Sequence, residues 1–252
     1  MSGWLRIIGL GPGGTALRTP EAEAALAAAT DLVGYGPYVA RVAARPGQRR
    51  HETDNRQELE RARHALEMAQ SGARVAVISS GDAGVFAMAS AVFEAIEHGP
   101  AAWRALDVAV LPGISAMFAA AARLGAPLGH DFCAISLSDN LKPWPLVEQR
   151  LAAAAGAGFV IALYNPISRA RPWQLGRAFE LLRGILPGET PVAFATAVTR
   201  PEERIELRPL AEADPALADM RTLVLIGSAA TRAIAREGAR SWLYTPRSAS
   251  SP

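Results

Sequence analysis

The segment 136–144, SLSDNLKPW, concentrates side chains that can transfer protons or hold a polar ligand. Asp139 and Lys142 are candidates for a general acid or base, and Ser138 and Asn140 can form hydrogen bonds to a substrate. The segment follows an apolar run and precedes a helix that begins with proline. It is therefore predicted to be a loop at the carboxyl end of a strand, where α/β sheets bind ligands. In the alternative interpretation, Asp139 or Asn140 forms an Asx turn that caps the next helix.

The histidines and the cysteine add little to this chemistry. His130 precedes the same apolar run and is a third candidate acid or base, although a buried, hydrogen-bonded histidine fits that position equally well. The four histidines are scattered and Cys133 is the only cysteine, so neither an internal disulfide nor a metal site is expected. Cys133 is predicted to be a core thiol.

A second polar segment, Asp54-Asn55-Arg56, stands at the start of a helical pattern, DNRQELERARHALEMAQSG. Asp54 is predicted to cap this helix and Gly72 to end it. Arg56 is free to bind a carboxylate through its forked guanidinium. The segment is therefore a candidate contact for an acidic small molecule.

A glycine-rich loop ends the first apolar run, WLRIIGLGPGG (4–14). Its glycines fit G-x-G-x-x-G, the fingerprint of dinucleotide-binding folds, but three features disfavour a dinucleotide. The first helix start, Thr19-Pro20, comes several residues too late, and Pro12 removes a backbone donor from the loop. The acidic residue expected after the second strand is also missing. An NAD-linked oxidoreductase is therefore a remote alternative.

Apolar runs typical of strands alternate with helical patterns along the chain. The predicted strands are 5–8, 31–35, 74–79, 107–111, 132–137, 159–163, 191–195, 204–208 and 222–226. The first half predicts a parallel sheet covered by helices, whereas the second half ends in strands without intervening helices and predicts a mixed sheet. Glycine and proline cluster in RLGAPLGHD (123–131), so we expect two α/β domains, 1–125 and 126–252.

The composition is typical of a globular enzyme. The 252 residues carry 26 basic and 24 acidic side chains, a formal charge of +2, without a basic block that would follow a nucleic-acid backbone. The longest nearly uncharged apolar run, 151–163, is shorter than the roughly 20 residues of a membrane helix. The first residues lack the pattern of an export signal. We expect a cytosolic protein that binds neither nucleic acid nor membrane.

Several motifs together resemble the tetrapyrrole (corrin/porphyrin) methyltransferases. The matching segments follow the family's order and spacing: GLGPG (9–13), SSGDAGVFAMAS (79–90), LPGISA (111–116), ALYNP (162–166) and PVAFATAVTRPEER (191–204). The resemblance covers nearly the whole chain. It implies two α/β domains with the active site in the cleft between them. It further implies S-adenosylmethionine as methyl donor, S-adenosylhomocysteine as product and a homodimer.

The resemblance also implies roles for single residues. The expected cofactor contacts are Gly11, Pro12, Gly13, Ser80, Gly81, Asp82, Val85, Ser115, Ala116, Asn165, Ala197 and Val198. The expected substrate contacts are Asp54, Asn55, Arg56, Ser138 and Asn140, with arginines binding the acetate and propionate arms. For Asp82, a helix N-cap is an equally good interpretation.

Within the family, three segments resemble the cobalamin-biosynthesis enzymes that methylate C-17 of precorrin-3B and contract the ring to give precorrin-4. They are GHDFCAISLSDNLKPW (129–144), LYNPISRARPWQLGRAFELL (163–182), and YGPYV (35–39) followed by DNR (54–56). Ring contraction requires a general acid or base, for which Asp139, Lys142 and His130 are the candidates. A cobalt-containing substrate, another ring position and a non-catalytic tetrapyrrole carrier are alternatives. The intact cofactor loops disfavour the carrier.

Three residues depart from the family pattern. Ser80 and Ala83 replace the usual glycine and proline of the second loop, where their main chains can make the same contacts. Thr199 stands where the family often has glycine, and a β-branched residue resists a positive φ. The resemblance therefore leaves the conformation of this last loop open.

Overall fold

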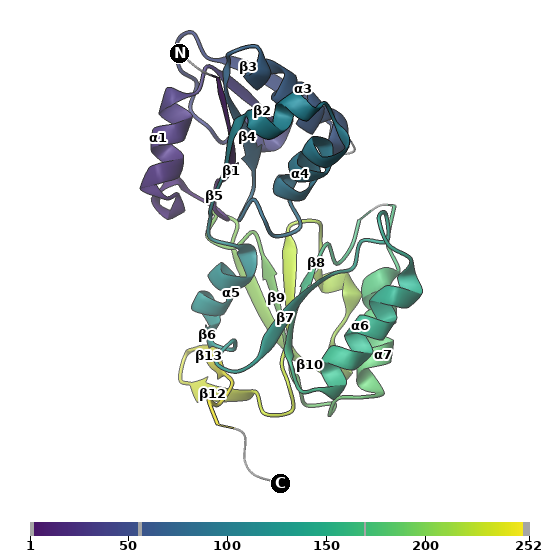
Figure 1. The fold of residues 1–252 in the computed structure, drawn as a ribbon. Helices are drawn as coiled ribbons and strands as arrows, with labels where there is room; N and C mark the ends of the chain where they lie inside the picture. Colours follow the sequence, from purple (N-terminus) through teal and green to yellow (C-terminus); the bar gives the residue numbers. More distant parts are fainter. Residues whose placement is uncertain (1–2, 55–56, 169, 249–252) are drawn as a thin grey trace. The chain divides into compact units, whose positions relative to one another are not determined.

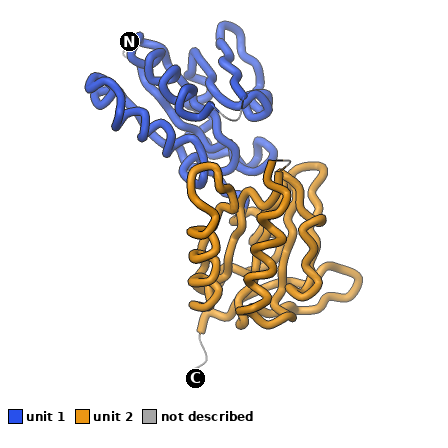
Figure 2. The backbone as a smooth tube through the Cα atoms, turned by 90° about the vertical axis from the view of Figure 1, so that its right-hand side faces the viewer, with its two compact units in different colours: residues 1–116 blue, residues 117–252 orange. Residues whose placement is uncertain are grey.

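The structure is a computed structural model that describes residues 3–54, 57–168 and 170–248 (Figure 1). The chain folds into two compact units, residues 1–116 and 117–252 (Figure 2). Asn55 and Arg56, two of the predicted substrate contacts, lie outside the described residues. None of the described helices combines the length and the apolar character that a membrane span requires.

The first unit contains a five-stranded parallel sheet with the strand order β3-β2-β4-β1-β5. Its strands are β1 (Trp4–Gly9), β2 (Asp31–Tyr35), β3 (Arg49–Thr53), β4 (Arg74–Ser79) and β5 (Asp107–Leu111). The predicted parallel sheet is confirmed. The edge strand β3 was not among the predicted strands, because its sequence RRHET is charged rather than apolar.

Helices cover both faces of this sheet (Figure 1). They are α1 (Pro20–Ala28), α2 (Gly36–Val39), α3 (Glu58–Gln70) and α4 (Met88–His98), and short 3₁₀ turns occupy Thr15–Leu17 and Ala101–Ala105. Residues of α1 and α2 pack with Leu32 on one face, and residues of α3 and α4 pack with Val33 on the other. Because successive strand residues face opposite sides, a sheet covered on both sides requires the continuous apolar runs seen in its inner strands.

The second unit contains a five-stranded mixed sheet with the strand order β10-β9-β11-β8-β7. Its strands are β7 (Phe132–Ser136), β8 (Val160–Tyr164), β9 (Pro191–Thr196), β10 (Arg204–Pro209) and β11 (Thr222–Ile226). β7 and β8 are parallel, β11 is antiparallel to β8 and β9, and β10 is antiparallel to β9. The predicted mixed sheet is confirmed. β7, β8 and β9 consequently run in one direction and end at the same edge.

Two layers cover this second sheet (Figure 1). Helices α6 (Trp144–Gly156) and α7 (Gln174–Arg183) pack on one face. The other face carries α5 (Ala116–Leu124) and a three-stranded sheet of β12 (Arg232–Arg236), β13 (Ala239–Tyr244) and β6 (Gly125–Ala126). Two 3₁₀ turns, Leu210–Glu212 and Pro215–Leu217, complete the unit.

The two compact units divide between Ala116 and Met117, at the start of α5, whereas the sequence analysis divides the chain after residue 125. Met117, Ala120 and Leu124 of α5 share a buried cluster with Ala193 and Leu223 of the second sheet. The helix therefore belongs to the second unit. The glycine- and proline-rich segment 123–131 instead contains β6, which pairs with β13. Its turn residues follow the end of α5.

The first helix begins as its sequence predicts. Thr19 is the N-cap of α1, and its Oγ1 accepts a hydrogen bond of 3.1 Å from the amide of Ala22. Pro20 occupies the first helical position, where its missing N–H costs nothing. The helix therefore starts well after the glycine loop, as the argument against a dinucleotide requires.

The predicted cap by Asp54 is wrong, and the alternative caps by Asp82 and by Asp139 or Asn140 are not formed either. Asp54 does not cap α3, Asp82 does not cap α4, and neither Asp139 nor Asn140 caps α6, because each of these helices begins without a side-chain cap bond. A capping side chain must stand directly before the first turn. Helices α3 and α4 begin several residues later than the apolar pattern suggests. Helix α6 begins next to Pro143, as expected, but Asp139 and Asn140 lie too far before it to cap it.

Candidate functional site

Three glycine loops meet at the carboxyl-end edge of the first sheet, after the neighbouring strands β4, β1 and β5. A Cβ atom added to Gly9 would lie 2.7 Å from the carbonyl oxygen of Gly81, and one added to Gly113 would meet the same oxygen. Gly11 and Gly81 exchange two backbone hydrogen bonds of 3.0 Å. The loops that carry the predicted cofactor residues of this unit therefore touch through their main chains, and no larger residue fits between them.

Asp82 connects the second of these loops to the third. Its Oδ1 accepts a hydrogen bond of 2.8 Å from the amide of Gly84, which forms an Asx turn. Its Oδ2 accepts a bond of 3.0 Å from the amide of Gly113. The carboxylate thus fixes the shape of both loops, a role that neither interpretation of Asp82 from the sequence included.

Arg41, in the turn after α2, joins the first loop to the second. Its Nη1 donates a bond of 2.9 Å to Ser80 Oγ, and its Nη2 donates bonds of 2.8 Å to the carbonyl oxygens of Gly11 and Gly13. Nothing in the sequence distinguishes Arg41 from the other arginines. Its position shortly after a strand of the parallel sheet is a signal that it shares with many other residues.

A buried arginine supports the end of β3, where substrate contacts were expected. Arg61 of α3 is 3% exposed, and its guanidinium donates bonds of 2.6 Å to Thr53 Oγ1 and to the carbonyl oxygen of Asp54. Burial lowers the pKa of Arg61, although the neighbouring Glu58 acts in the opposite direction. Arg61 thereby holds the chain at Asp54, the first residue of the predicted substrate segment.

In the second unit, hydrogen bonds join the loops that follow β7 and β8. Asn165 adopts a left-handed backbone with φ of 51°, and its Nδ2 donates a bond of 2.9 Å to Ser136 Oγ. Ser138 Oγ accepts a bond of 2.9 Å from Arg171 Nη1. The structure therefore brings the predicted residues Asn165 and Ser138 to one edge of this sheet.

Asp139 and Lys142 lie in the same loop, and both are partly buried. Asp139 Oδ2 accepts a bond of 3.2 Å from Gln174 Nε2 at the start of α7. Burial lowers the pKa of Lys142, and the positive charge of Arg150 acts in the same direction. A lysine with a lowered pKa exchanges its proton more readily near neutral pH. Asn140, beside them, is exposed.

His130 is not brought to this edge. It precedes β7, whereas Asp139 and Lys142 follow it, and a strand of five residues is about 17 Å long. The His130 ring lies 4.0 Å from the carboxylate of the neighbouring Asp131. The three candidate acid–base residues therefore do not form one group. Cys133 packs against the core, where burial raises the pKa of its thiol.

The loop after β9 contains two residues with a left-handed backbone, Ala197 with φ of 48° and Thr199 with φ of 66°. The amide of Thr199 donates a bond of 2.6 Å to Glu203 Oε2, which also accepts a bond of 3.1 Å from Arg123. Burial opposes the charge of Glu203, but these donors outweigh it and hold the pKa of Glu203 below its usual value. The threonine thus adopts a conformation typical of glycine, and its hydrogen bond to the Glu203 carboxylate stabilises this conformation.

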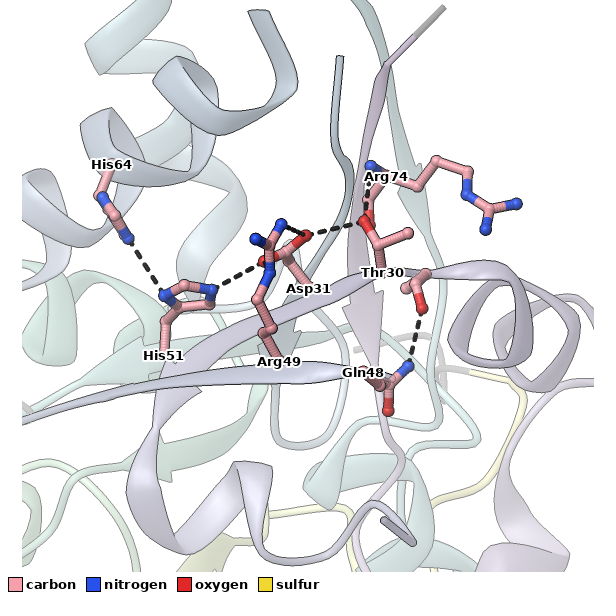
Figure 3. Close-up of polar contacts among 8 residues, drawn as sticks. Thr30, Asp31, Gln48, Arg49, His51, His64 and Arg74 are labelled. Carbon is pink, nitrogen blue, oxygen red and sulfur yellow. Dashed lines mark hydrogen bonds and ion pairs between the residues drawn. The ribbon is translucent and has the colours of Figure 1, made fainter. Parts of the chain in front are cut away.

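A second polar cluster lies at the opposite, amino-end edge of the first sheet (Figure 3). Asp31 is fully buried and accepts bonds of 2.8 and 2.9 Å from Arg49, 2.8 Å from His51 and 2.7 Å from Thr30. Burial raises the pKa of Asp31, but these donors outweigh it and lower the pKa to about 2. His64 Nε2 lies 3.4 Å from His51 Nδ1.

This amino-end cluster does not form a metal centre. Within the part of the chain that the structure describes, no group of three or more histidine, cysteine, aspartate or glutamate side chains is arranged to hold a metal ion. The donors around Asp31 instead satisfy its carboxylate from within the protein. The cluster is therefore built to stabilise the start of β2 and β3.

The edge of the first sheet where the loops of Gly9, Gly81 and Gly113 meet is called the glycine edge below. Comparisons with known proteins agree with the motifs found there. Residues 5–214 match the family model of the tetrapyrrole (corrin/porphyrin) methylases. A Sinorhizobium protein named precorrin-3B C(17)-methyltransferase is 58% identical over 247 residues, which are 98% of this chain and 97% of that protein. A Salmonella typhimurium protein named "Probable cobalt-factor III C(17)-methyltransferase" is 46% identical over 230 residues, 90% of this chain and 93% of that protein.

The solved structure of the methyltransferase CobJ has the same fold. It superposes with a TM-score of 0.92 at 57% sequence identity and covers 97% of this chain and 100% of its own. The family match, 5–214, includes the glycine edge of the first unit and the loops after β7, β8 and β9 of the second. The chain therefore belongs to the tetrapyrrole (corrin/porphyrin) methylase family.

Proposed function

We propose that this protein is an S-adenosylmethionine-dependent methyltransferase of cobalamin biosynthesis. It methylates C-17 of precorrin-3B and contracts the macrocycle to give precorrin-4. The observation that carries this proposal is the 58% identity to a relative of that name over nearly the full length of both chains. A cobalt-containing acceptor is the second candidate, supported by the 46% identity to the Salmonella relative.

The glycine edge suits S-adenosylmethionine better than a dinucleotide. S-adenosylmethionine has no phosphate and presents an adenine edge, a ribose diol and a carboxylate, which main-chain donors and acceptors can bind at close range. The close approach of Gly9, Gly81 and Gly113 keeps side chains away from this edge. Bound there, the cofactor supplies an electrophilic methyl group.

We assign the cofactor contacts to the residues that the motifs indicate. In the first unit they are Gly11, Pro12, Gly13, Ser80, Gly81, Asp82, Val85, Ser115 and Ala116. In the second unit they are Asn165, Ala197 and Val198. Asp54, Ser138 and Asn140 are the proposed substrate contacts that lie in the described residues. Supporting this assignment, Asn165 and Ala197 share the left-handed backbone that turns a chain sharply after a strand.

Ring contraction requires proton transfer from a hydroxyl of the macrocycle while a carbon–carbon bond migrates. We assign this role to Asp139 and Lys142, and their position in one loop after β7 supports the assignment. The lowered pKa of Lys142 supports its assignment to this proton transfer. His130, at the other end of β7, is the weaker candidate.

Anaerobic incubation with S-adenosylmethionine and either precorrin-3B or its cobalt-containing counterpart tests the proposal. We expect a product heavier by one methyl group, with the absorption change of a contracted ring, from precorrin-3B. Conversion of the cobalt substrate alone would establish the second candidate. Calorimetry adds a test of the cofactor, because tighter binding of NAD than of S-adenosylhomocysteine would contradict the assignment.

Substitution of Lys142 tests the acid–base assignment. Lys142→Arg keeps the charge but replaces a compact ammonium by a forked guanidinium with a much higher pKa. We expect Lys142→Arg and Lys142→Ala to lose turnover or substrate affinity while they retain binding of S-adenosylhomocysteine. Wild-type turnover in both variants would remove Lys142 from the mechanism.

We also propose that the protein is a cytosolic homodimer. The family resemblance supports the dimer, and the single cysteine is compatible with a reducing compartment. Light scattering at micromolar concentration should return twice the chain mass of 26.6 kDa. A monomer mass would contradict the dimer.

A further inference from the structure

We propose that Arg41 is a positioning residue that holds two cofactor loops in their binding conformation. The proposal rests on the proposed function, because it concerns the loops assigned to S-adenosylmethionine. Arg41 lies outside the family motifs that identify these loops. Its role follows from the contacts of its guanidinium.

The guanidinium of Arg41 spans the two loops. One terminal nitrogen donates to Ser80 Oγ in the second loop, and the other donates to two carbonyl oxygens, Gly11 and Gly13, in the first. All three distances, 2.8 to 2.9 Å, are typical of hydrogen bonds from a charged nitrogen donor. The planar fork of arginine reaches both loops at once, which a single ammonium group cannot do.

The main chain of Arg41 is itself held in place. The carbonyl oxygen of Arg41 accepts a bond of 3.1 Å from Arg18 Nη2. Arg18 is nearly buried, with 4% of its side chain exposed, and its other nitrogen donates a bond of 2.7 Å to Glu23 of α1. The guanidinium of Arg41 is therefore presented from a fixed backbone rather than from a loose turn.

The two loops need such support because neither is part of a helix or an extended strand pair. Residues 10–14 and 80–87 are irregular, and Gly11 and Gly81 exchange two backbone hydrogen bonds that join the loops. A ligand that binds only one loop arrangement has an apparent affinity reduced by the fraction of molecules that hold that arrangement. Arg41 raises this fraction before the ligand arrives.

Titration of S-adenosylhomocysteine into wild type, Arg41→Lys and Arg41→Ala tests the role in binding. We expect the Kd to rise about 10-fold to 100-fold in Arg41→Ala, which corresponds to a competent fraction of about 1–10%. Arg41→Lys should fall between the two, since lysine can keep a bond to one loop. Added guanidinium ion should restore part of the affinity of Arg41→Ala, which a merely misfolded variant would not show.

Hydrogen exchange of the ligand-free protein tests separately whether Arg41 holds the two loops together. The amides of Gly11 and Gly81 should exchange faster in Arg41→Ala than in wild type, while amides of β8 stay unchanged. Failure of wild type to bind S-adenosylhomocysteine would overturn the proposed cofactor. Unchanged exchange in Arg41→Ala would overturn the positioning role of Arg41 and leave the cofactor assignment intact.

Arg50→Ala is the matched control. Arg50 donates bonds of 3.3 and 2.6 Å to the carbonyl oxygens of Val39, at the end of α2, and Val42, in the turn that follows, but neither acceptor belongs to a glycine loop. We expect Arg50→Ala to reduce stability without raising the Kd. An equal rise in Kd in both variants would overturn the proposal, because loosening of the turn would then explain the effect. A Kd within twofold of wild type in Arg41→Ala would also overturn it.

Discussion

At the carboxyl-end edge of the first sheet, loops approach each other through glycines, carbonyl oxygens and amides. At the amino-end edge of the same sheet, a fully buried carboxylate is surrounded by arginine, histidine and threonine side chains (Figure 3). The amino-end edge has more titratable groups, and the pKa of its Asp31 is lowered to about 2. The first edge nevertheless carries the family motifs.

The difference teaches that a dense group of charges need not be a binding site. The donors around Asp31 satisfy its carboxylate from within the protein, so the cluster gains stability from its own contacts. At the glycine edge the backbones of the loops approach each other closely. A ligand there is therefore expected to bind mainly to backbone amides and carbonyl oxygens. The comparison predicts that substitutions at one edge affect binding and that those at the other affect only stability.

Gly113→Ala should have the largest effect. The added Cβ would meet the carbonyl oxygens of Gly81 and Gly9, which are backbone atoms that cannot rotate away. We expect a loss of about 3 kcal/mol or more in the free energy of unfolding, together with loss of S-adenosylhomocysteine binding. Chemical denaturation and calorimetry measure the two effects. Gly14→Ala is the control, since a Cβ there meets nothing within 4 Å; a comparable loss of stability in both variants would contradict the packing argument.

Asp31→Asn should destabilise the protein without weakening ligand binding. The substitution removes the charge that Arg49 and His51 contact, but Arg49 is 69% exposed and can turn to water. We expect the free energy of unfolding to fall by about 2 kcal/mol. Asp107→Asn breaks an exposed pair with Arg6 and should cost less than about 1 kcal/mol. Weaker binding of S-adenosylhomocysteine in Asp31→Asn would break the contrast between the two edges.

The lowered pKa of Asp31 should also appear in the pH dependence of the free energy of unfolding. The pKa of Asp31 is about 2 in the folded protein and 3.8 in its ordinary state, so its stabilising contribution is complete above pH 3.8. That contribution is lost as the pH falls from 3.8 towards 2. The difference in unfolding free energy between wild type and Asp31→Asn should therefore be constant down to about pH 4 and shrink below it. A difference that stays constant to pH 2 would rule out the lowered pKa.

Thr199→Gly should have the smallest effect and the opposite sign. Thr199 has φ of 66°, and its Oγ1 is buried without a hydrogen-bond partner among the described residues. Glycine relieves both costs and keeps the amide that Glu203 binds, but it adds freedom to the unfolded chain. We expect a gain of up to about 1 kcal/mol in thermal or chemical unfolding. A loss of stability would show that the threonine side chain supports the loop.

The sequence predicts the inner strands of both sheets because burial on two faces requires apolar runs, as in β2 and β8. It does not predict β3, whose charged residues pair only because a neighbouring strand is already in place. It also places the starts of α3 and α4 several residues too early. Those starts depend on how far each loop extends over the sheet edge, which tertiary contacts decide.

The site divides in the same way. The loops with glycine motifs could be found from the sequence, because the close approach of Gly9, Gly81 and Gly113 forbids any other residue. Arg41 and Arg61 could not, because their roles depend on which carbonyl oxygens the fold brings within reach. His130 illustrates the converse, since a residue near a motif in sequence can stand at the other end of the strand.

The charged edge strand β3 also bears on how the protein behaves in concentrated solution. An open sheet edge offers unpaired amides and carbonyls to strands of other molecules, and this is a common route to aggregation. β3 carries Arg49, Arg50, His51 and Glu52 along that edge, and three of its five residues are only partly buried. A strand from another copy would have to desolvate these charges before it could pair. The charged residues that prevented the prediction of β3 thus also hinder pairing of this sheet edge with the sheets of other copies of the protein.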